Sequence, residues 1–194
     1  MKQAQASKTA TYVATMRAIG QRAPWVPGFN DPTAEVFMGK NYRKFEARLK
    51  ARFGKFLAHK LESFWSSLSI NFQFRTVVLD LIIDQAKPFD QLVILGAGYD
   101  GRAWRLESLR NVKVYEVDHP ATQAVKKQAV KNLTQCAADV QLLPIDFTKD
   151  DLGECLDRAG LNKNLKTVWI WEGVVMYLTP DQIRQTMQCI AARS

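Results

Sequence analysis

Long apolar runs, paired cysteines and internal repeats are all missing from this sequence of 194 residues. No apolar run approaches the roughly 20 residues needed to cross a bilayer, so the sequence predicts no membrane span. The first residues lead into no continuous apolar stretch, which argues against a secretory signal. The three cysteines are far apart and odd in number, so neither a disulfide framework nor a zinc spacing is visible. We therefore expect a cytoplasmic protein that holds no metal.

Positive charge is concentrated in one segment, because residues 40–60 carry eight basic residues against Glu46 alone. They account for 8 − 1 = 7 of the net charge of +8, so the rest of the chain is close to neutral. The basic residues are Lys40, Arg43, Lys44, Arg48, Lys50, Arg52, Lys55 and Lys60. They form the solvated face of an amphipathic helix, or they cover an active site or attract an acidic substrate. Phe45, Phe53 and Phe56 fall on an apolar stripe, which argues against a stacking surface for nucleic acid.

The first half of the chain, residues 1–90, has the pattern of an N-terminal helical cap region. Ser7 is a candidate cap for a helix over 7–19, and Asp31-Pro32 is typical of a second helix start. From residue 41 an apolar stripe predicts a long helix, in which Gly54 is a weak point. That stripe consists of Phe45, Leu49, Phe53, Phe56 and Leu57. Residues 70–86 predict another helix, which Lys87-Pro88 ends.

The second half, residues 91–194, alternates between short apolar runs and helical patterns. Strands are expected over 91–95, 112–117, 140–145 and 167–171. A turn and helix over 98–109, and helices over 120–132, 150–159 and 180–191, follow them in turn. This alternation predicts an α/β fold with a doubly wound parallel sheet and helices on both faces. Ligands of such folds bind beyond the carboxyl ends of the strands.

Four polar or glycine-rich signatures follow the four predicted strands. Gly96 and Gly98 allow a tight turn and a close approach of the backbone to a ligand. Asp118 follows Gly96 by 118 − 96 = 22 positions, the spacing expected for an acid that accepts the hydroxyls of a ribose. Asp146 and the adjacent Phe147 suit an adenine, through its amino group and its ring face. Glu172 follows the last strand. Together the four indicate a nucleoside site.

Each signature also has a plainer interpretation. The glycines could form only a tight turn, and Asp118 could cap the following helix. Asp146 could be a turn residue, and Glu172 a solvated strand end. The glycine pattern also fits a nicotinamide dinucleotide, so the residues alone leave the cofactor open.

Three long motifs resemble the leucine carboxyl methyltransferase family, namely residues 95–106, 115–123 and 169–178. Thr9-Ala10, Val13-Ala14 and Arg17-Ala18, followed by Asp31-Pro32, resemble the bacterial branch of S-adenosylmethionine-dependent methyltransferases in that family. Arg75-Thr76 with Asp80 resembles the helix that precedes the first strand. The resemblance extends from about Ser7 to the C-terminus.

The resemblance implies a class I methyltransferase fold, Rossmann-like, with S-adenosyl-L-methionine as cofactor. It implies that Arg75 pairs with the methionine carboxylate, for which a guanidinium is well suited. The further implied roles are Gly96 and Gly98 beside the methionine, Asp118 on the ribose, Asp146 and Phe147 on the adenine, and Glu172 on the methionine amino group.

The reaction implied by the resemblance is methyl transfer to an oxygen of a small-molecule or protein acceptor, either a carboxylate or a hydroxyl. A carboxylate is already ionised, so the enzyme has to align and desolvate it and needs no dedicated base. We therefore assign no catalytic residue. His119 precedes Pro120 at a strand end, where a structural role is expected.

Members of this family continue beyond the helix over 180–191 with further strands. We therefore expect a C-terminally truncated chain, either a fragment or a shortened gene product, with an incomplete sheet of about four strands. Residues 168–171 would then form an apolar edge that invites pairing, for example with a second copy in a homodimer. The alternative to an active enzyme is a catalytically inactive module for cofactor binding or dimerisation.

Overall fold

The computed structural model describes residues 6–193, and within residues 40–62 it describes some positions by their backbone alone. The chain divides into two compact units. The sheet unit contains residues 83–98 and 102–193, and the helical unit contains residues 7–82 together with Tyr99–Gly101. The domain division at residue 90 stays a prediction.

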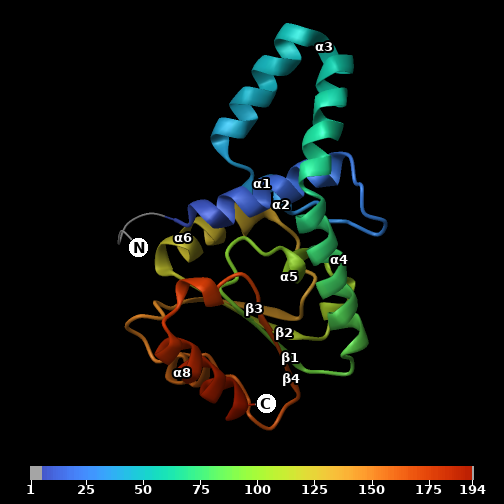
Figure 1. The fold of residues 1–194 in the computed structure, drawn as a ribbon. Coiled ribbons are helices and arrows are strands. Elements are labelled where there is room, and N and C mark those ends of the chain that lie inside the picture. Colours follow the sequence, from blue (N-terminus) through green and yellow to red (C-terminus); the bar gives the residue numbers. More distant parts are fainter. Residues whose placement is uncertain (1–5, 194) are drawn as a thin grey trace. The chain divides into compact units, whose positions relative to one another are not determined.

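Four parallel strands form the sheet of the sheet unit, as the sequence predicted (Figure 1). They are β1 (Gln91–Leu95), β2 (Lys113–Asp118), β3 (Asp139–Pro144) and β4 (Thr167–Trp171), in the order β3-β2-β1-β4. The expected α/β, Rossmann-like fold is confirmed. Because β2 and β4 lie on opposite sides of β1, the strand order reverses between β1 and β4. In such sheets that reversal opens a crevice at the carboxyl edge.

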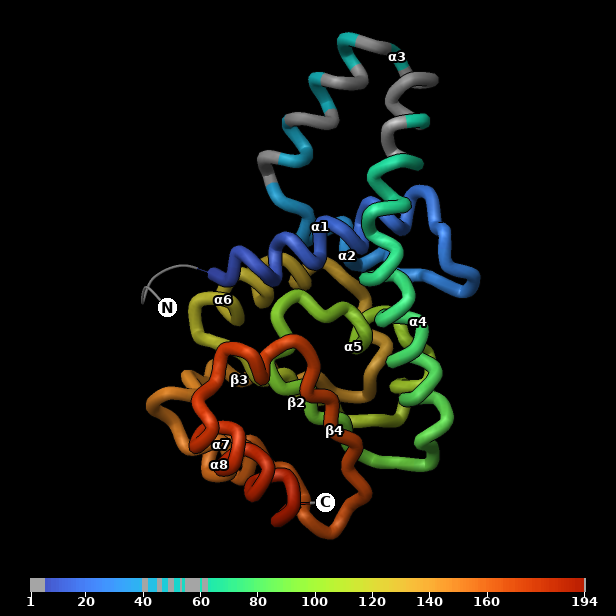
Figure 2. Tube along the Cα trace, viewed as in Figure 1, coloured from blue at the N-terminus to red at the C-terminus, as the bar shows by residue number. Residues whose placement is uncertain are grey.

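Both faces of the sheet carry helices. On one face, Val93, Tyr115 and Val117 pack into a core that includes Leu152 and Leu156 of α7 (Leu152–Arg158). The last helix, α8 (Pro180–Ala191), lies beside α7 and adds partly buried residues to the same core (Figure 2). The other face carries α6 (Pro120–Ala129), which an ion pair within the core joins to β2. Alternate residues of buried strands therefore contact different helices, as expected for a doubly wound sheet.

A turn and then a helix were expected over 98–109, and the helix in this range is interrupted. A four-residue helix α5 (Arg102–Arg105) is followed by a 3₁₀ turn η1 (Glu107–Leu109). Leu106 between them has extended backbone angles, with φ −91° and ψ 105°, which end the first helix. The helix expected over 120–132 likewise continues past Ala129 as a 3₁₀ turn, η2 (Val130–Asn132). A last 3₁₀ turn, η3 (Val175–Tyr177), follows β4.

The helical unit contains α1 (Lys8–Arg22), α2 (Ala34–Phe37), α3 (Lys40–Leu68) and most of α4 (Ile70–Gln85). Ser7 caps α1 as predicted, since its hydroxyl accepts a hydrogen bond from the Ala10 amide at 3.0 Å. The start of α2 was predicted two residues too early. Its N-cap is Thr33, and Asp31 instead accepts a hydrogen bond from the Ala34 amide at 3.2 Å. Gly54, with φ 72°, breaks α3 into two helical segments.

The basic segment is exposed at the described side chains, which are Arg43, Lys44, Arg48, Arg52 and Lys60. The side chains of the predicted apolar stripe, and those of Lys40, Lys50 and Lys55, lie outside the described residues. Within the described chain, no helix combines the length and apolar character needed for a membrane span. Cys136, Cys155 and Cys189 are free thiols.

Candidate functional site

The four strand ends meet at one edge of the sheet. Leu95 at the end of β1 pairs with Val117 of β2 and with Trp171 of β4. Asp118 at the end of β2 pairs with Pro144 of β3. Asp118 and the residues just after the other three strands therefore form one row, in the order Asp146, Asp118, Gly96 and Glu172. The sequence predicted that these positions would share an edge, and the strand register confirms it.

The turn after β1 needs glycine at its first position. Gly96 has φ 67° and Gly98 has φ 51°, a region that residues with a Cβ rarely adopt. A Cβ on Gly96 would lie 1.9 Å from Cγ2 of Val174, in the segment after β4. The turn is fixed at Ala97, whose amide donates to the Val117 carbonyl at 2.9 Å. Close packing of the turn against Val174 therefore joins the ends of β1 and β4.

Asp118 joins the end of β2 to the same turn. Its Oδ2 accepts a hydrogen bond from the Gly98 amide at 2.6 Å, and its Oδ1 accepts one from the His119 amide at 2.7 Å. The interpretation of Asp118 as the cap of α6 is wrong, because His119 is the cap. The His119 Nδ1 accepts a hydrogen bond from the Ala121 amide at 3.2 Å, so this histidine has the structural role expected for it.

Asp146 follows β3 and its carboxylate is held in a polar turn. Its Oδ1 accepts hydrogen bonds from the Thr148 hydroxyl at 2.7 Å and from the Thr148 amide at 3.0 Å. Its Oδ2 lies 3.2 Å from Lys149 Nζ and 3.9 Å from His119 Nε2. The Thr148 hydroxyl, the Thr148 amide and then Lys149 lower the pKa of Asp146 to about 2. Asp146 is thus a turn residue that remains ionised at the edge of the sheet.

The other predicted site residues are Phe147, Glu172 and Arg75, for which the structure gives mainly the burial and the neighbouring element. Phe147 packs partly against the core on the α7 face. Glu172 is half-buried directly after β4, two positions before Val174. Arg75 is exposed on α4 in the helical unit, with its guanidinium carbon 5.8 Å from the centre of the Phe72 ring. The cofactor-binding roles of all these residues stay predictions. No cluster of three or more metal-ligating side chains occurs among the residues that the structure describes.

Sequence reasoning assigned no role to Arg17, which belongs to a motif of the resemblance. Arg17 is buried on α1 and donates from its guanidinium to the Tyr99 carbonyl at 2.6 Å. Buried alanines, Ala14 and Ala18, flank it on the same helix. In the sequence, an arginine between alanines on a predicted helix is a signal for a buried charge, which would then need a partner, because charges are rarely buried unpaired.

The comparisons with known proteins point to one family. The family model of leucine carboxyl methyltransferase matches residues 10–191. A protein of Mycobacterium avium (strain 104), named "Putative S-adenosyl-L-methionine-dependent methyltransferase", is 31% identical over 194 residues. That match covers 96% of this chain and 60% of the relative.

Other relatives bear the same name. One from Mycobacterium bovis (strain BCG / Pasteur 1173P2) is 32% identical over 192 residues, covering 96% of this chain and 54% of the relative. One from Mycolicibacterium gilvum (strain PYR-GCK) is 30% identical over 181 residues, covering 89% of this chain and 57% of the relative. The chain therefore spans less than two thirds of the length of these relatives.

Proposed function

The chain belongs to the leucine carboxyl methyltransferase family, and from this we propose that it binds S-adenosyl-L-methionine and transfers a methyl group to an acceptor oxygen. The observation that carries the proposal is the row of Asp146, Asp118, Gly96 and Glu172 along one edge of the sheet. Gly96 and Glu172 in this row follow β1 and β4, between which the strand order reverses, and such a reversal is the usual ligand position in doubly wound folds.

The residues present suit the cofactor. Gly96 and Gly98 form a turn without side chains, so a ligand can approach the backbone closely. Asp118 offers a carboxylate beside that turn for the ribose hydroxyls. Asp146, with Phe147 next to it, is proposed to hold the adenine. Glu172 is ionisable and follows β4, as an acceptor for an ammonium group requires.

Arg75 enters the proposal through the resemblance. Its exposed guanidinium has the charge and the paired donors that a carboxylate such as that of methionine needs. Its role is tested separately from the sheet edge, by the effect of Arg75→Met on cofactor affinity.

When bound, S-adenosyl-L-methionine supplies an electrophilic methyl group, which an ionised oxygen accepts directly while the sulfonium becomes a neutral thioether. The protein then has to orient the two reactants and exclude water. The turn at Gly96–Gly98 and the carboxylate of Asp118 would hold the ligand in position. A carboxylate acceptor needs no proton removed, whereas a hydroxyl acceptor needs a base.

Titration of the purified protein with S-adenosyl-L-methionine and S-adenosyl-L-homocysteine tests the proposal. Saturable binding of both, at one site per chain, is the expected result. An absence of binding would contradict the proposal for this chain. Binding of NADH in place of both would assign the site to a dinucleotide instead.

The class of acceptor is tested with radioactive methyl donor and a panel of aliphatic carboxylic acids, aromatic carboxylic acids and phenols. Alkali releases methanol from a methyl ester but leaves a methyl ether intact, so treatment of the product separates a carboxylate acceptor from a hydroxyl acceptor. Binding without transfer to any member of the panel would favour the non-catalytic alternative.

A further inference from the structure

The second half of the glycine-rich turn is held by buried contacts within the helical unit. We propose that Arg17 is a positioning residue, which fixes the backbone of Tyr99 and thereby keeps the adjoining Gly98 in a conformation that is ready for the cofactor. The inference rests on the proposed function for its ligand, but the contacts themselves do not.

Arg17 makes two separate contacts with its guanidinium group. One nitrogen, Nη1, lies 3.0 Å from Oδ2 of Asp31, and the other, Nη2, donates to the Tyr99 carbonyl at 2.6 Å. The side chains of Arg17 and Asp31 are 8% and 0% exposed, so the pair is shielded from water. Shielding strengthens a charged hydrogen bond and makes its loss costly. A buried charge is therefore used to hold one backbone carbonyl.

Asp31 is itself held in place. Its Oδ1 accepts a hydrogen bond from the Thr33 hydroxyl at 2.6 Å and one from the Ala34 amide at 3.2 Å. The start of α2 thus fixes the carboxylate, and the carboxylate fixes the orientation of Arg17. This arrangement gives the guanidinium little freedom to leave Tyr99.

Two further contacts hold the residues around that carbonyl. The Tyr99 ring stacks on Phe37 with a centroid distance of 4.9 Å and an interplanar angle of 1°. A Cβ on Gly101 would lie 1.7 Å from the Thr33 hydroxyl, so the backbone there packs directly against α2. Residues 99–101 are therefore packed closely on both sides of the Arg17 contact.

Gly98 directly precedes Tyr99, and the Gly98 amide is bonded to Asp118. Two successive residues are thus held, one through its amide and the next through its carbonyl. A binding loop that is already fixed loses less conformational freedom when a ligand binds, so the ligand binds more tightly. Loss of the Arg17 contact should therefore weaken binding without removing any group that touches the ligand.

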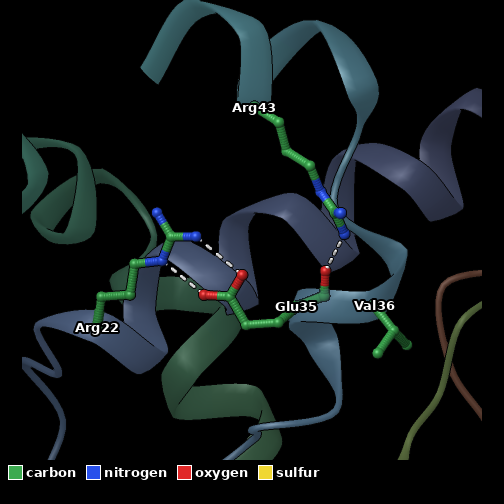
Figure 3. A pocket seen from close by; sticks show the side chains of 4 residues that line it. All are labelled: Arg22, Glu35, Val36 and Arg43. Atoms are coloured by element: carbon green, nitrogen blue, oxygen red, sulfur yellow. Dashed lines mark hydrogen bonds and ion pairs between the residues drawn. The ribbon is translucent and has the colours of Figure 1, made fainter. Parts of the chain in front are cut away.

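Arg22 provides a matched control on the same helix. It also joins α1 to α2, through hydrogen bonds of 2.5 and 2.8 Å to the two carboxylate oxygens of Glu35 (Figure 3). With Glu35, Val36 and Arg43 it lines an open hollow of about 570 Å³. These hydrogen bonds join α1 to Glu35 of α2, away from Tyr99 and the contact that Arg17 makes there.

The test compares Arg17→Lys with Arg22→Lys. In both variants lysine keeps the positive charge opposite the carboxylate. In Arg17→Lys, however, a single ammonium cannot replace the two guanidinium nitrogens that contact Asp31 and the Tyr99 carbonyl. S-adenosyl-L-homocysteine should bind to Arg17→Lys about tenfold more weakly than to the wild type, and to Arg22→Lys with unchanged affinity. Equal affinities of the two variants would overturn the inference. If Arg17→Lys does not fold, Phe37→Leu takes its place, because it removes the stacking on Tyr99. This variant should also bind S-adenosyl-L-homocysteine more weakly than the wild type, by a smaller factor.

Hydrogen exchange of the ligand-free protein gives a second measurement. Peptides that cover residues 96–101 should exchange faster in Arg17→Lys than in the wild type, and at the wild-type rate in Arg22→Lys. Unchanged exchange in Arg17→Lys would contradict the inference even if the wild type binds the ligand. If the wild type binds no ligand, the proposed function fails, and the exchange rates alone decide whether Arg17 holds the turn.

Discussion

The Asp118 carboxylate accepts a hydrogen bond from the Gly98 amide at 2.6 Å, which joins the end of β2 to the turn after β1. Its second oxygen accepts the amide of the next residue, His119. A carboxylate can accept about four hydrogen bonds, so acceptor positions remain for ligand hydroxyls beside the turn. Asp118 can thus shape the turn and still bind a ligand.

Asp118→Asn should weaken S-adenosyl-L-homocysteine binding by about ten- to a hundredfold, because hydrogen bonds to a charged group contribute about 1.5–3 kcal/mol. Asparagine keeps one acceptor oxygen for the Gly98 amide but loses the charge and the second acceptor. Isothermal titration calorimetry measures the affinity, and circular dichroism checks the fold.

Asp139→Asn is the control for that change. Asp139 begins β3, at the other edge of the sheet, with a half-exposed side chain that lies 3.7 Å from Lys113 Nζ. Its substitution should leave the affinity unchanged. Equal weakening by both substitutions would show that a loss of negative charge, rather than the contact at the turn, lowers the affinity.

Several elements could be predicted from local pattern alone. The bounds of β1, β4 and α8 agree with those predicted, because short apolar runs and a helical pattern identify them without tertiary information. The start of α2 could not be predicted in the same way. Asp31 is a typical cap by sequence, but its carboxylate forms an ion pair with Arg17 and the helix starts after Thr33.

In the candidate site too, some features could be predicted from the sequence and others could not. Asp118 and Asp146 could be found because parallel strands bring the residues after them to a common edge. The contacts that shape the turn could not be found. Val174 follows Gly96 by 174 − 96 = 78 positions, and Tyr99 follows Arg17 by 99 − 17 = 82 positions. No local periodicity relates residues that are so far apart in the sequence.

Gly96→Ala should destabilise the protein by more than Gly160→Ala does. Both glycines have positive φ, 67° at Gly96 and 81° at Gly160. An alanine at either position therefore introduces backbone strain of about 1–2 kcal/mol. At Gly160 the nearest atom to a new Cβ is 3.8 Å away, whereas at Gly96 it is 1.9 Å away. Overpacking at Gly96 should add about 1–3 kcal/mol. Urea unfolding measures both variants.

Val174→Ala identifies the source of the extra cost at Gly96. In the Gly96→Ala/Val174→Ala double variant the clash with Cγ2 is removed, so the difference from Gly160→Ala should become small. If Val174→Ala brings no recovery, the close approach of the turn to the segment after β4 is not what makes glycine necessary.

Lys126→Met should destabilise the sheet unit by about 3–5 kcal/mol, because it leaves the Glu116 carboxylate buried without its cation. Both side chains are 0% exposed, and Lys126 also lies 5.3 Å from the centre of the Trp104 ring. Replacement of both partners, as Glu116→Gln/Lys126→Met, should recover much of the stability. Denaturant unfolding of the single and double variants gives the coupling energy. Additive effects would mean that the two groups are not paired in solution.

Acid should neutralise Asp146 only near pH 2, because the pKa of its carboxyl is lowered to about 2 by the Thr148 hydroxyl, the Thr148 amide and Lys149. Its folded-state pKa lies below the unfolded value of about 3.9, so its ionised form stabilises the fold above that value. This contribution falls as the pH decreases from about 4 towards 2. Asp146→Asn should therefore lose less stability than the wild type between about pH 4 and pH 2.

Carboxyl-carbon NMR measures the titration of Asp146 directly. Thr148→Val removes the hydroxyl donor and keeps the amide, so the pKa of Asp146 should rise in that variant but stay below the ordinary value, since the amide and Lys149 still favour the ionised form. The rise should be accompanied by lower stability near neutral pH and by a weaker dependence of stability on acid. A wild-type Asp146 that titrates at the ordinary value would show that the turn over 146–149 does not form in solution as the structure has it.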